Sequence, residues 1–543
     1  MTTTIVLIQP PIRDFYLTRK RTVPYGLLSL AAQLKAAGFT VAVLDALATD
    51  KSRLIEPPES MRYLAPYYGR EDFSPFALFH GFRHYGYSFQ HIGRYIQETA
   101  PFLVGISALF SSYTDTALYT AEIVRRRLPE AAIVMGGHHA TAMPAHIMAC
   151  NAVDLVLRGE GEFSLPLLAG ALQSGQEDLS HIPGIVFRKP DGSLHISPPA
   201  VVDKLDDPAP PAISLLKHAY YRRHRKNSWV ITAGRGCPLN CSYCAVGQRS
   251  PLPYRRRSVA SVIRELETAV TEFKAGFIDF EDENISFDRR WFKQLLRAIA
   301  DRFSAASLEI RAMNGLFPPS LDDETVQLMQ QAGFRTLNLA LGTSSKDQLR
   351  RFNRPDVRSG FEKALNLAEK YDLQAVGYII AAAPGQNPAA SVEDLLYLAA
   401  RRVLAGFSIF YPAPGSADFD LCRAQGLLPP DPALFRSSAL PIDHTTSRTD
   451  AATLLRLARI LNYMKALLDR DIRIPPPLAL PRRERMNPEN RDHVGKRLLQ
   501  AFRHDGGIRG ITADGEIFAH TVSPALIRRF VAVLRRIPIR GCR

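Results

Sequence analysis

The sequence predicts an α/β protein with two successive domains of alternating strands and helices, followed by a mainly helical C-terminal segment. Short apolar runs alternate with amphipathic segments over residues 1–170 and again over 226–425. This alternation is typical of parallel sheets that are covered by helices. After residue 426 helical periodicity recurs, for example at 453–468 and 525–536, on either side of a proline-rich stretch at 474–477. These three observations define the expected fold class.

The first predicted domain, residues 1–170, contains five apolar runs with the composition of buried strands. They lie at 5–8, 39–44, 103–107, 132–135 and 154–157, with helices at 26–37 and 114–127 between them. Ligands of such sheets bind at the carboxyl ends of the strands, so the loops that follow the strands are the informative ones. These loops contain Pro10, Ser107, Gly136, Gly137, His138, Gly159, Glu160 and Gly161.

Residues 171–225 are predicted to connect the two domains. A hairpin is expected over 185–196, with Pro190, Asp191 and Gly192 as its turn, followed by a proline-rich linker at 205–211. The second domain then begins a new series of strands. They are expected at 229–233, 276–281, 308–313, 336–341, 375–382 and 407–412.

A cysteine motif, Cys237, Cys241 and Cys244, directly follows the first strand of the second domain. An ordinary 4Fe–4S cluster is held by four thiolates, so a site with three leaves one iron open to a small molecule. A zinc site would need a second ligand pair at short spacing, and no such pair follows before Cys422. Unrelated core cysteines are the other alternative. The isolated Cys150, Cys422 and Cys542 are interpreted as structural or free thiols.

The C-x3-C-x2-C spacing resembles the radical S-adenosylmethionine (SAM) superfamily, in which the open iron binds the amino and carboxylate groups of SAM. The resemblance implies a partial (β/α)6 TIM-type radical SAM barrel over 226–425 and a C-terminal substrate or closure segment over 426–543. Glu283 replaces an aspartate of the family's motif, and Thr343 stands where a glutamate is common. The implied SAM contacts are Tyr243, Asp282, Glu283, Arg311, Asn314, Gly342 and Thr343. Shielding of the cluster is the alternative role for Tyr243, and capping or surface roles are the alternatives for the strand-end residues.

The first 170 residues resemble the cobalamin-binding domain that is fused to some radical SAM enzymes. The segments "PP", "GIS", "GGHHAT" and "RGEGE" match that pattern, and they imply a Rossmann-like domain whose strand-end loops contact cobalamin. Glycines there would let the backbone approach a flat corrin closely. The family's D-x-H-x-x-G motif is missing, which implies that no protein histidine ligates the cobalt. A degenerate Rossmann domain that binds nothing is the alternative.

Residues 51–100 form a long insertion rich in Tyr, Phe, His and Pro. Such a loop is usually functional or packed against a neighbour. The alternatives are a position over the corrin or facing the barrel, and packing is the role that we expect.

Composition and charge limit the remaining possibilities. The 543 residues carry a net charge of +15, and residues 471–543 contain 15 Lys and Arg against 7 Asp and Glu. Few aromatic residues accompany these charges, so we expect no nucleic-acid binding; a solvated basic face is favoured over an anionic substrate or peripheral membrane contact. No apolar run reaches the roughly 20 residues of a membrane helix. The clustered cysteines indicate a reducing compartment, so the expected location is cytoplasmic.

By resemblance, the chain is a cobalamin-dependent radical SAM enzyme, class B methyltransferase-like, with a 4Fe–4S cluster, SAM and cobalamin as cofactors. The implied activity is methylation of an unactivated carbon in a small-molecule or lipid substrate, with flavodoxin or ferredoxin as electron donor. One alternative is a radical cyclase or rearranging enzyme similar to the anaerobic Mg-protoporphyrin monomethyl ester cyclase. A cobalamin-binding sensor or carrier is an alternative from another class.

Overall fold

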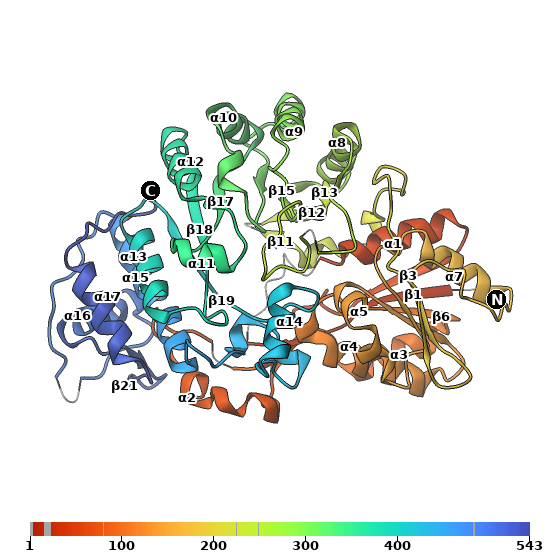
Figure 1. The fold of residues 1–543 in the computed structure, drawn as a ribbon, viewed down its shortest axis with the longest axis horizontal. Helices are drawn as coiled ribbons and strands as arrows, with labels where there is room; N and C mark the ends of the chain where they lie inside the picture. Colours follow the sequence, from red (N-terminus) through yellow and green to blue (C-terminus); the bar gives the residue numbers. More distant parts are fainter. Residues whose placement is uncertain (1–3, 16–22, 80, 224, 248, 482–483) are drawn as a thin grey trace. The chain divides into compact units, whose positions relative to one another are not determined.

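The computed structural model describes residues 4–15, 23–79, 81–223, 225–247, 249–481 and 484–543, and the chain forms two compact units (Figure 1). The first unit comprises residues 1–55, 82–238 and 245–283, and the second comprises 56–81, 239–244 and 284–543. The fold class agrees with the expectation: an α/β N-terminal domain, a series of βα units and a helical C-terminal segment. The expected domain boundaries at 170, 225 and 425 stay predictions.

The first unit is built on a seven-stranded sheet with the order β10-β9-β8-β7-β6-β1-β3. The five strands from β3 to β8 are parallel, and β9 and β10 join antiparallel at one edge. The strands are β1 (Thr4–Gln9), β3 (Thr40–Asp45), β6 (Leu103–Ser107), β7 (Ala132–Gly136), β8 (Leu155–Leu157), β9 (Ile185–Arg188) and β10 (Leu194–Ile196).

Helices cover both faces of this sheet, which explains why its strands are continuously apolar. In β1, Val6 and Ile8 pack toward α3 (Phe89–Thr99) and α4 (Thr114–Arg127). The alternate residues Ile5 and Leu7 pack toward α1 (Tyr25–Ala36) and α7 (Ser164–Gln173). All four side chains are fully buried, and Figure 1 shows the two helix pairs on opposite faces of the sheet.

The expected hairpin at 185–196 is present as β9 and β10, and it pairs with β8. It therefore continues the first sheet and is not part of a free linker. The physical reason is burial: Ile185 and Val186 are completely buried within the sheet's cores.

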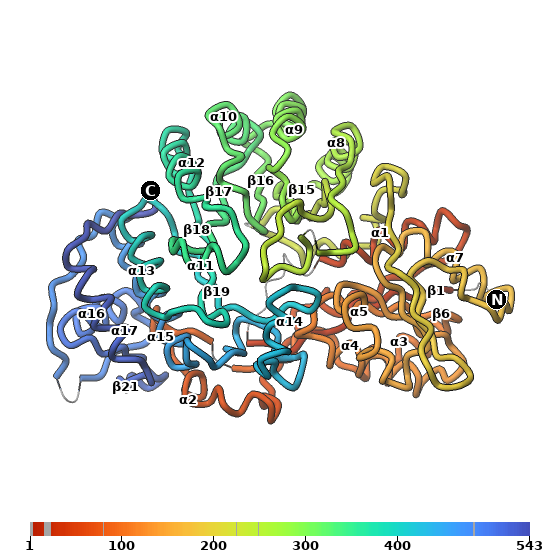
Figure 2. Tube along the Cα trace, in the orientation of Figure 1, coloured from red at the N-terminus to blue at the C-terminus, as the bar shows by residue number. Residues whose placement is uncertain are grey.

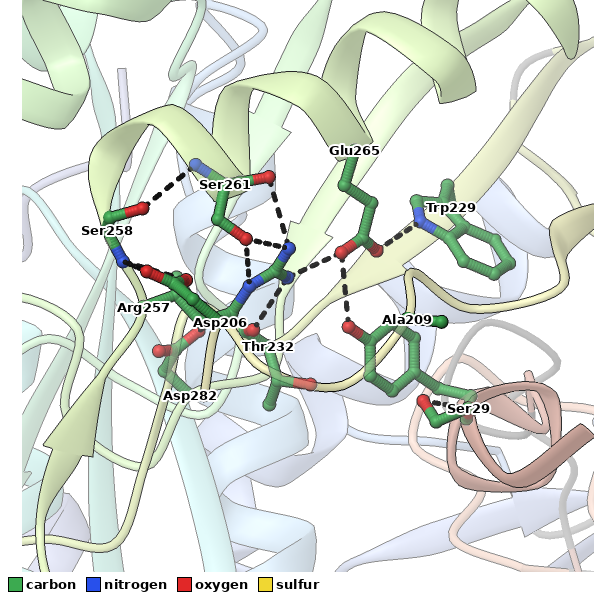
Figure 3. A network of polar contacts seen from close by, with 12 residues as sticks. Ser29, Asp206, Ala209, Trp229, Thr232, Arg257, Ser258, Ser261, Glu265 and Asp282 are labelled. Carbon is green, nitrogen blue, oxygen red and sulfur yellow. Dashed lines mark hydrogen bonds and ion pairs between the residues drawn. The ribbon is translucent and has the colours of Figure 1, made fainter. Parts of the chain in front are cut away.

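The first two strands of the second series also belong to the first unit. β12 (Lys226–Ile231) and β15 (Ala275–Phe280) are parallel, with Trp229 opposite Ile278. Figure 3 shows the buried polar network beside them. Glu265 of α8 (Val259–Glu267) accepts hydrogen bonds from Trp229 Nε1 at 3.0 Å, from Arg257 and from Tyr25 Oη at 3.3 Å. This network joins the start of α1 to the first βα unit of the series.

The other four strands of the series lie in the second unit. They are β16 (Glu309–Arg311), β17 (Thr336–Gly342), β18 (Gln374–Ala381) and β19 (Leu404–Ile409), and the last three form a parallel sheet. β19 begins three residues before the expected run at 407–412. Its pairing with residues 376–381 ends at Ile409, and one further hydrogen bond of 2.8 Å runs from the Phe410 amide to the Ala381 carbonyl oxygen.

The C-terminal segment is mainly helical, as expected, but it also contains a short hairpin. Its helices are α15 (Arg448–Leu468), α16 (Arg491–Asp505) and α17 (Pro524–Leu534), and its hairpin strands are β20 (Arg509–Ile511) and β21 (Ile517–Ala519). α15 and α17 pack beside α13 (Pro388–Ala399), as Figure 2 shows. Among the described helices, none has the length and apolar character needed to span a bilayer.

Residues 56–79, in the middle of the expected insertion, belong to the second unit and pack within it. Asp72 is buried and accepts hydrogen bonds from His520 Nε2 at 2.9 Å and from the Ile511 amide at 3.2 Å. The Phe76 and Tyr463 rings meet edge to face at 5.4 Å. We expected a packing role for this insertion without naming its partner, and these contacts are made with the C-terminal segment.

Candidate functional site

Asp282 and Glu283 lie two and three residues after the end of β15, and Asp282 contacts the backbone shortly before the cysteine motif. Asp282 is buried and accepts a hydrogen bond from the Ala233 amide at 3.0 Å. Burial raises the pKa of Asp282 to about 8 and the pKa of Glu283 to about 7. Glu283 Oε2 is buried and has no hydrogen-bond partner among the described residues. An unpaired buried carboxylate oxygen is costly, so this atom fits a cationic group such as the ammonium of SAM.

Two glutamates of the "RGEGE" segment bind arginines that flank the cysteine motif. Arg235, two residues before Cys237, pairs with Glu162 and lies 3.2 Å from Glu160. Arg255 donates two parallel bonds of 2.8 Å to the Glu160 carboxylate. Burial opposes ionisation of Glu160, but these bonds outweigh it and hold the pKa of that carboxyl below its ordinary value. The loop that follows β8 in the first domain is thus joined by ion pairs and hydrogen bonds to the segment that contains Cys237.

These contacts give Glu160 a partner within the protein, and its role as a cobalamin contact stays a prediction. At two of the loop positions, glycine is required for a reason that does not involve a corrin. A Cβ on Gly159 (φ +81°) would lie 2.2 Å from the Ala200 carbonyl oxygen, and one on Gly137 (φ +119°) would lie 2.8 Å from that of Ala108. Backbone crossings therefore require glycine at both positions.

Large apolar side chains are exposed to solvent in the loops that follow the carboxyl ends of the first sheet's strands. Leu109 and Phe110, which follow β6, are 40% and 47% exposed, and Phe163, which follows the "RGEGE" segment, is 47% exposed. His138 begins α5 (His138–Ala142) after β7 and is also exposed. Apolar surface at the ligand-binding edge of a parallel sheet fits a large flat ring such as a corrin. Pattern analysis did not select these three apolar residues, since strand-end loops are normally searched for polar groups.

His139, the neighbour of His138, makes its hydrogen bonds within the protein. It is buried, with its ring nitrogens 2.8 Å from Ser111 Oγ and 3.1 Å from His146 Nδ1. Burial lowers the pKa of His139 to about 4. Pro10 is buried at the end of β1, and Ser107 pairs in register with Gly136 at the ends of β6 and β7. Ser107 and Gly136 thus lie at the predicted edge.

Cys241, Tyr243 and Cys244 lie in residues 239–244, here called the cysteine loop, which belong to the second unit. Cys241 is buried, and Cys237 and Cys244 are partly exposed. Tyr243 meets the Phe352 ring edge to face at 4.9 Å. Burial raises the pKa of Tyr243 above its ordinary value, and the nearby sulfurs of Cys241 and Cys244 add to this effect. Cys422 lies in an apolar cluster next to Tyr243, which agrees with a structural role.

The motif loop contains an arginine contact that the sequence did not reveal. Arg354 Nη1 lies 3.6 Å from Cys241 Sγ and donates a bond of 3.2 Å to Tyr243 Oη. A cation beside a sulfur favours the thiolate, which is the form that binds iron. Within the described residues, no three His, Cys, Asp or Glu side chains converge as they would on a single metal ion.

The other predicted SAM residues occupy strand ends of the second unit. Arg311 ends β16, with its Nε 3.3 Å from Glu309 Oε1, and Asn314 is exposed beyond it. Thr343 is fully buried, and its hydroxyl donates to the carboxylate of Asp394. The Thr343 side chain is therefore engaged within the protein. Gly342 borders Arg354.

Two family models match the chain. Residues 18–169 match the B12 binding domain, and residues 231–398 match the radical SAM superfamily. The chain is a radical SAM enzyme that carries an N-terminal B12-binding domain.

The relatives are mainly methyltransferases. An uncharacterized methyltransferase of Pyrococcus horikoshii is 27% identical over 63% of this chain and 73% of its own length. Cytidylyl-2-hydroxyethylphosphonate methyltransferase of Streptomyces wedmorensis is 25% identical over 76% of this chain and 80% of its own. The anaerobic magnesium-protoporphyrin IX monomethyl ester cyclase of Rubrivivax gelatinosus is 27% identical over 47% of this chain and 46% of its own length.

Solved structures share the fold. The radical SAM methyltransferase TsrM of Kitasatospora setae, with cobalamin and a 4Fe–4S cluster bound, superposes with a TM-score of 0.58 at 20% identity, over 78% of this chain and 75% of that one. The likeness to TsrM shows a shared fold, and the two matched family models place the chain among the cobalamin-dependent radical SAM enzymes.

Proposed function

We propose that this enzyme transfers a methyl group to an unactivated carbon of a small-molecule or lipid substrate. The observation that carries the proposal is the presence of two distinct sites in one chain. One is the three-cysteine loop with Arg354 beside Cys241, and the other is the first sheet's edge with exposed Leu109, Phe110 and Phe163. A cobalamin sensor or carrier would not need the first site.

Bound at these sites, the cluster and SAM would supply a carbon-centred radical that removes hydrogen from the substrate, and cobalamin would supply the methyl group. The protein's contribution is binding and orientation. Cys237, Cys241 and Cys244 would hold the cluster, and Glu283 Oε2 would accept from the SAM ammonium. Arg235 and Arg255, through Glu160 and Glu162, would fix the loop that leads to Cys237.

The test uses the reconstituted holoenzyme under anaerobic, reducing conditions with methyl-labelled SAM and fractionated small-molecule and lipid extracts. We expect label to appear, bonded to carbon, in the product from one fraction. Cys241→Ala, which loses a cluster ligand, should transfer no label. If deoxyadenosine forms but no fraction accepts label, methyl transfer is wrong.

That second outcome would favour a radical cyclase, the candidate suggested by the similarity to the magnesium-protoporphyrin cyclase. We favour methyl transfer because the methyltransferase of Streptomyces wedmorensis matches over 80% of its length and the cyclase over 46%. An electron donor such as flavodoxin or ferredoxin and a cytoplasmic location complete the proposal. Replacing the chemical reductant with reduced flavodoxin tests the donor.

A further inference from the structure

Arg354 lies in the short segment Phe352–Pro355 that follows α11 (Lys346–Arg351). Its side chain is buried and contacts the cysteine loop and β17. Nη1 is 3.6 Å from Cys241 Sγ and 3.2 Å from Tyr243 Oη, and Nη2 donates to the Ala340 carbonyl oxygen. The guanidinium therefore sits directly at one of the three predicted cluster ligands.

The surrounding backbone is arranged to hold this side chain. Gly342 has φ +83°, and a Cβ at that position would lie 3.1 Å from both Cδ and Nε of Arg354. On the other side, the Ser242 amide donates to the Phe352 carbonyl oxygen at 2.8 Å, and Asn353 Nδ2 donates to the Asn240 carbonyl oxygen at 2.9 Å. The segment that carries Arg354 is thus hydrogen-bonded to the cysteine loop at several points.

Among the described residues, Arg354 has no carboxylate partner, and its buried Nε has no hydrogen-bond partner. A buried cation without a counter-charge is strongly unfavourable. Its contacts are a carbonyl oxygen, a phenol and the Cys241 sulfur. Of these three groups, the thiolate of a cluster ligand is the one that supplies a negative charge.

We propose that Arg354 raises the reduction potential of the cluster by placing a buried positive charge and an N–H donor on Cys241. The oxidised cluster takes up one electron from an external reductant, which adds one negative charge and breaks no bond. Net charge and hydrogen bonds to the sulfurs set the potential of such clusters. A nearby cation stabilises the reduced, more negative form, so reduction becomes easier. This role rests on the cluster assignment and is separate from the choice of substrate.

The test is a redox titration of reconstituted protein with Ti(III) citrate, followed by electron paramagnetic resonance, without SAM, cobalamin or substrate. Arg354→Gln removes the charge, and we expect the equilibrium constant for one-electron reduction to fall about tenfold, which is a shift of about 59 mV to lower potential. Arg354→Lys should give a smaller shift. Arg350→Gln, an exposed change of equal charge on α11, is the matched control and should leave the potential unchanged.

A fully loaded Arg354→Gln variant with the parent's potential would overturn the proposal. If this variant folds but takes up no cluster, restored loading in Arg354→Lys supports a need for the cation. Loss of loading in both variants would assign Arg354 to packing and overturn the proposal. A parent protein that binds no iron would instead contradict the enzyme class, so the two failures are distinguishable.

Discussion

The residues around the cysteine loop combine local backbone demands with buried charge. Gly342 adopts a left-handed φ, and the absence of its Cβ makes room for Arg354. Asp282 is held by the Ala233 amide in a buried position. Both residues were predicted to contact SAM, and both have a structural task that is independent of SAM.

Replacing Gly342 with alanine should destabilise the protein twice over. The left-handed backbone costs about 1–3 kcal/mol for a residue with a side chain, and the new Cβ would press on Arg354 at 3.1 Å. Gly426→Ala is the control, because Gly426 has φ +66° with open space around its Cβ position. Denaturant unfolding should show a larger loss for Gly342→Ala. Equal losses would mean that the contact with Arg354 has no energetic effect.

Asp282 should make the stability of the apoprotein fall as pH rises. Its folded-state pKa is raised from 3.8 to about 8 by burial. Between these two values the unfolded state releases the proton while the folded state retains it, so stability decreases with rising pH. Asp282→Asn should flatten the dependence of the free energy of unfolding on pH between about 4 and 8. The exposed variant Asp301→Asn should keep the parent's slope; an unchanged slope in Asp282→Asn would contradict the assignment.

At the scale of elements, ion pairs connect segments that are distant in sequence. The loop after β8 holds the segment around β13 (Gly234–Arg235) through Glu160 and Glu162. In the second unit, Asp72 of the insertion is enclosed by His520, Ile511 and, at 3.9 Å, Arg456. The Arg235–Glu162 and His520–Asp72 contacts are hydrogen bonds whose carboxylate partners are buried, unlike exposed ion pairs, which contribute little.

Arg235→Met should be more damaging than Glu162→Gln. Losing Arg235 leaves two buried carboxylates, Glu160 and Glu162, without this cation, and breaking a buried pair in this way costs about 3–5 kcal/mol. Glu162→Gln leaves Arg235 paired with Glu160, so its cost should be smaller. Melting temperatures of the two apoprotein variants test the order. The reverse order would show that the pairs do not hold this loop.

Asp72→Ala should release the insertion from the second unit's C-terminal hairpin. Hydrogen exchange in residues 56–79 should increase, because the change removes the acceptor for His520 and the Ile511 amide. Glu59→Ala serves as the control, since Glu59 pairs with Arg62 on the exposed surface. That variant should exchange like the parent. Unchanged exchange in Asp72→Ala would show that other contacts, such as those of Phe76, hold the insertion.

For the whole molecule, the positive charge of the C-terminal segment is partly neutralised within the fold. Arg497 pairs with Glu484, Arg529 with Glu393 and Arg540 with Glu369. A basic stretch in the sequence is therefore not a free basic surface over its full length. A solvated basic face, the interpretation that we preferred for these residues, stays a prediction.

The sequence by itself determined the fold class, the order of the domains and the chemistry of the motif loop. These features depend on local patterns: Ile5–Ile8 is apolar because both faces of β1 are covered, and the cysteine spacing lies within eight residues. The tertiary structure decided which side chains contact one another. Arg354 is 113 residues from Cys241, Glu162 is 73 from Arg235 and Asp72 is 448 from His520. Contacts over such separations depend on how elements pack, and a pattern in one sequence does not record that packing.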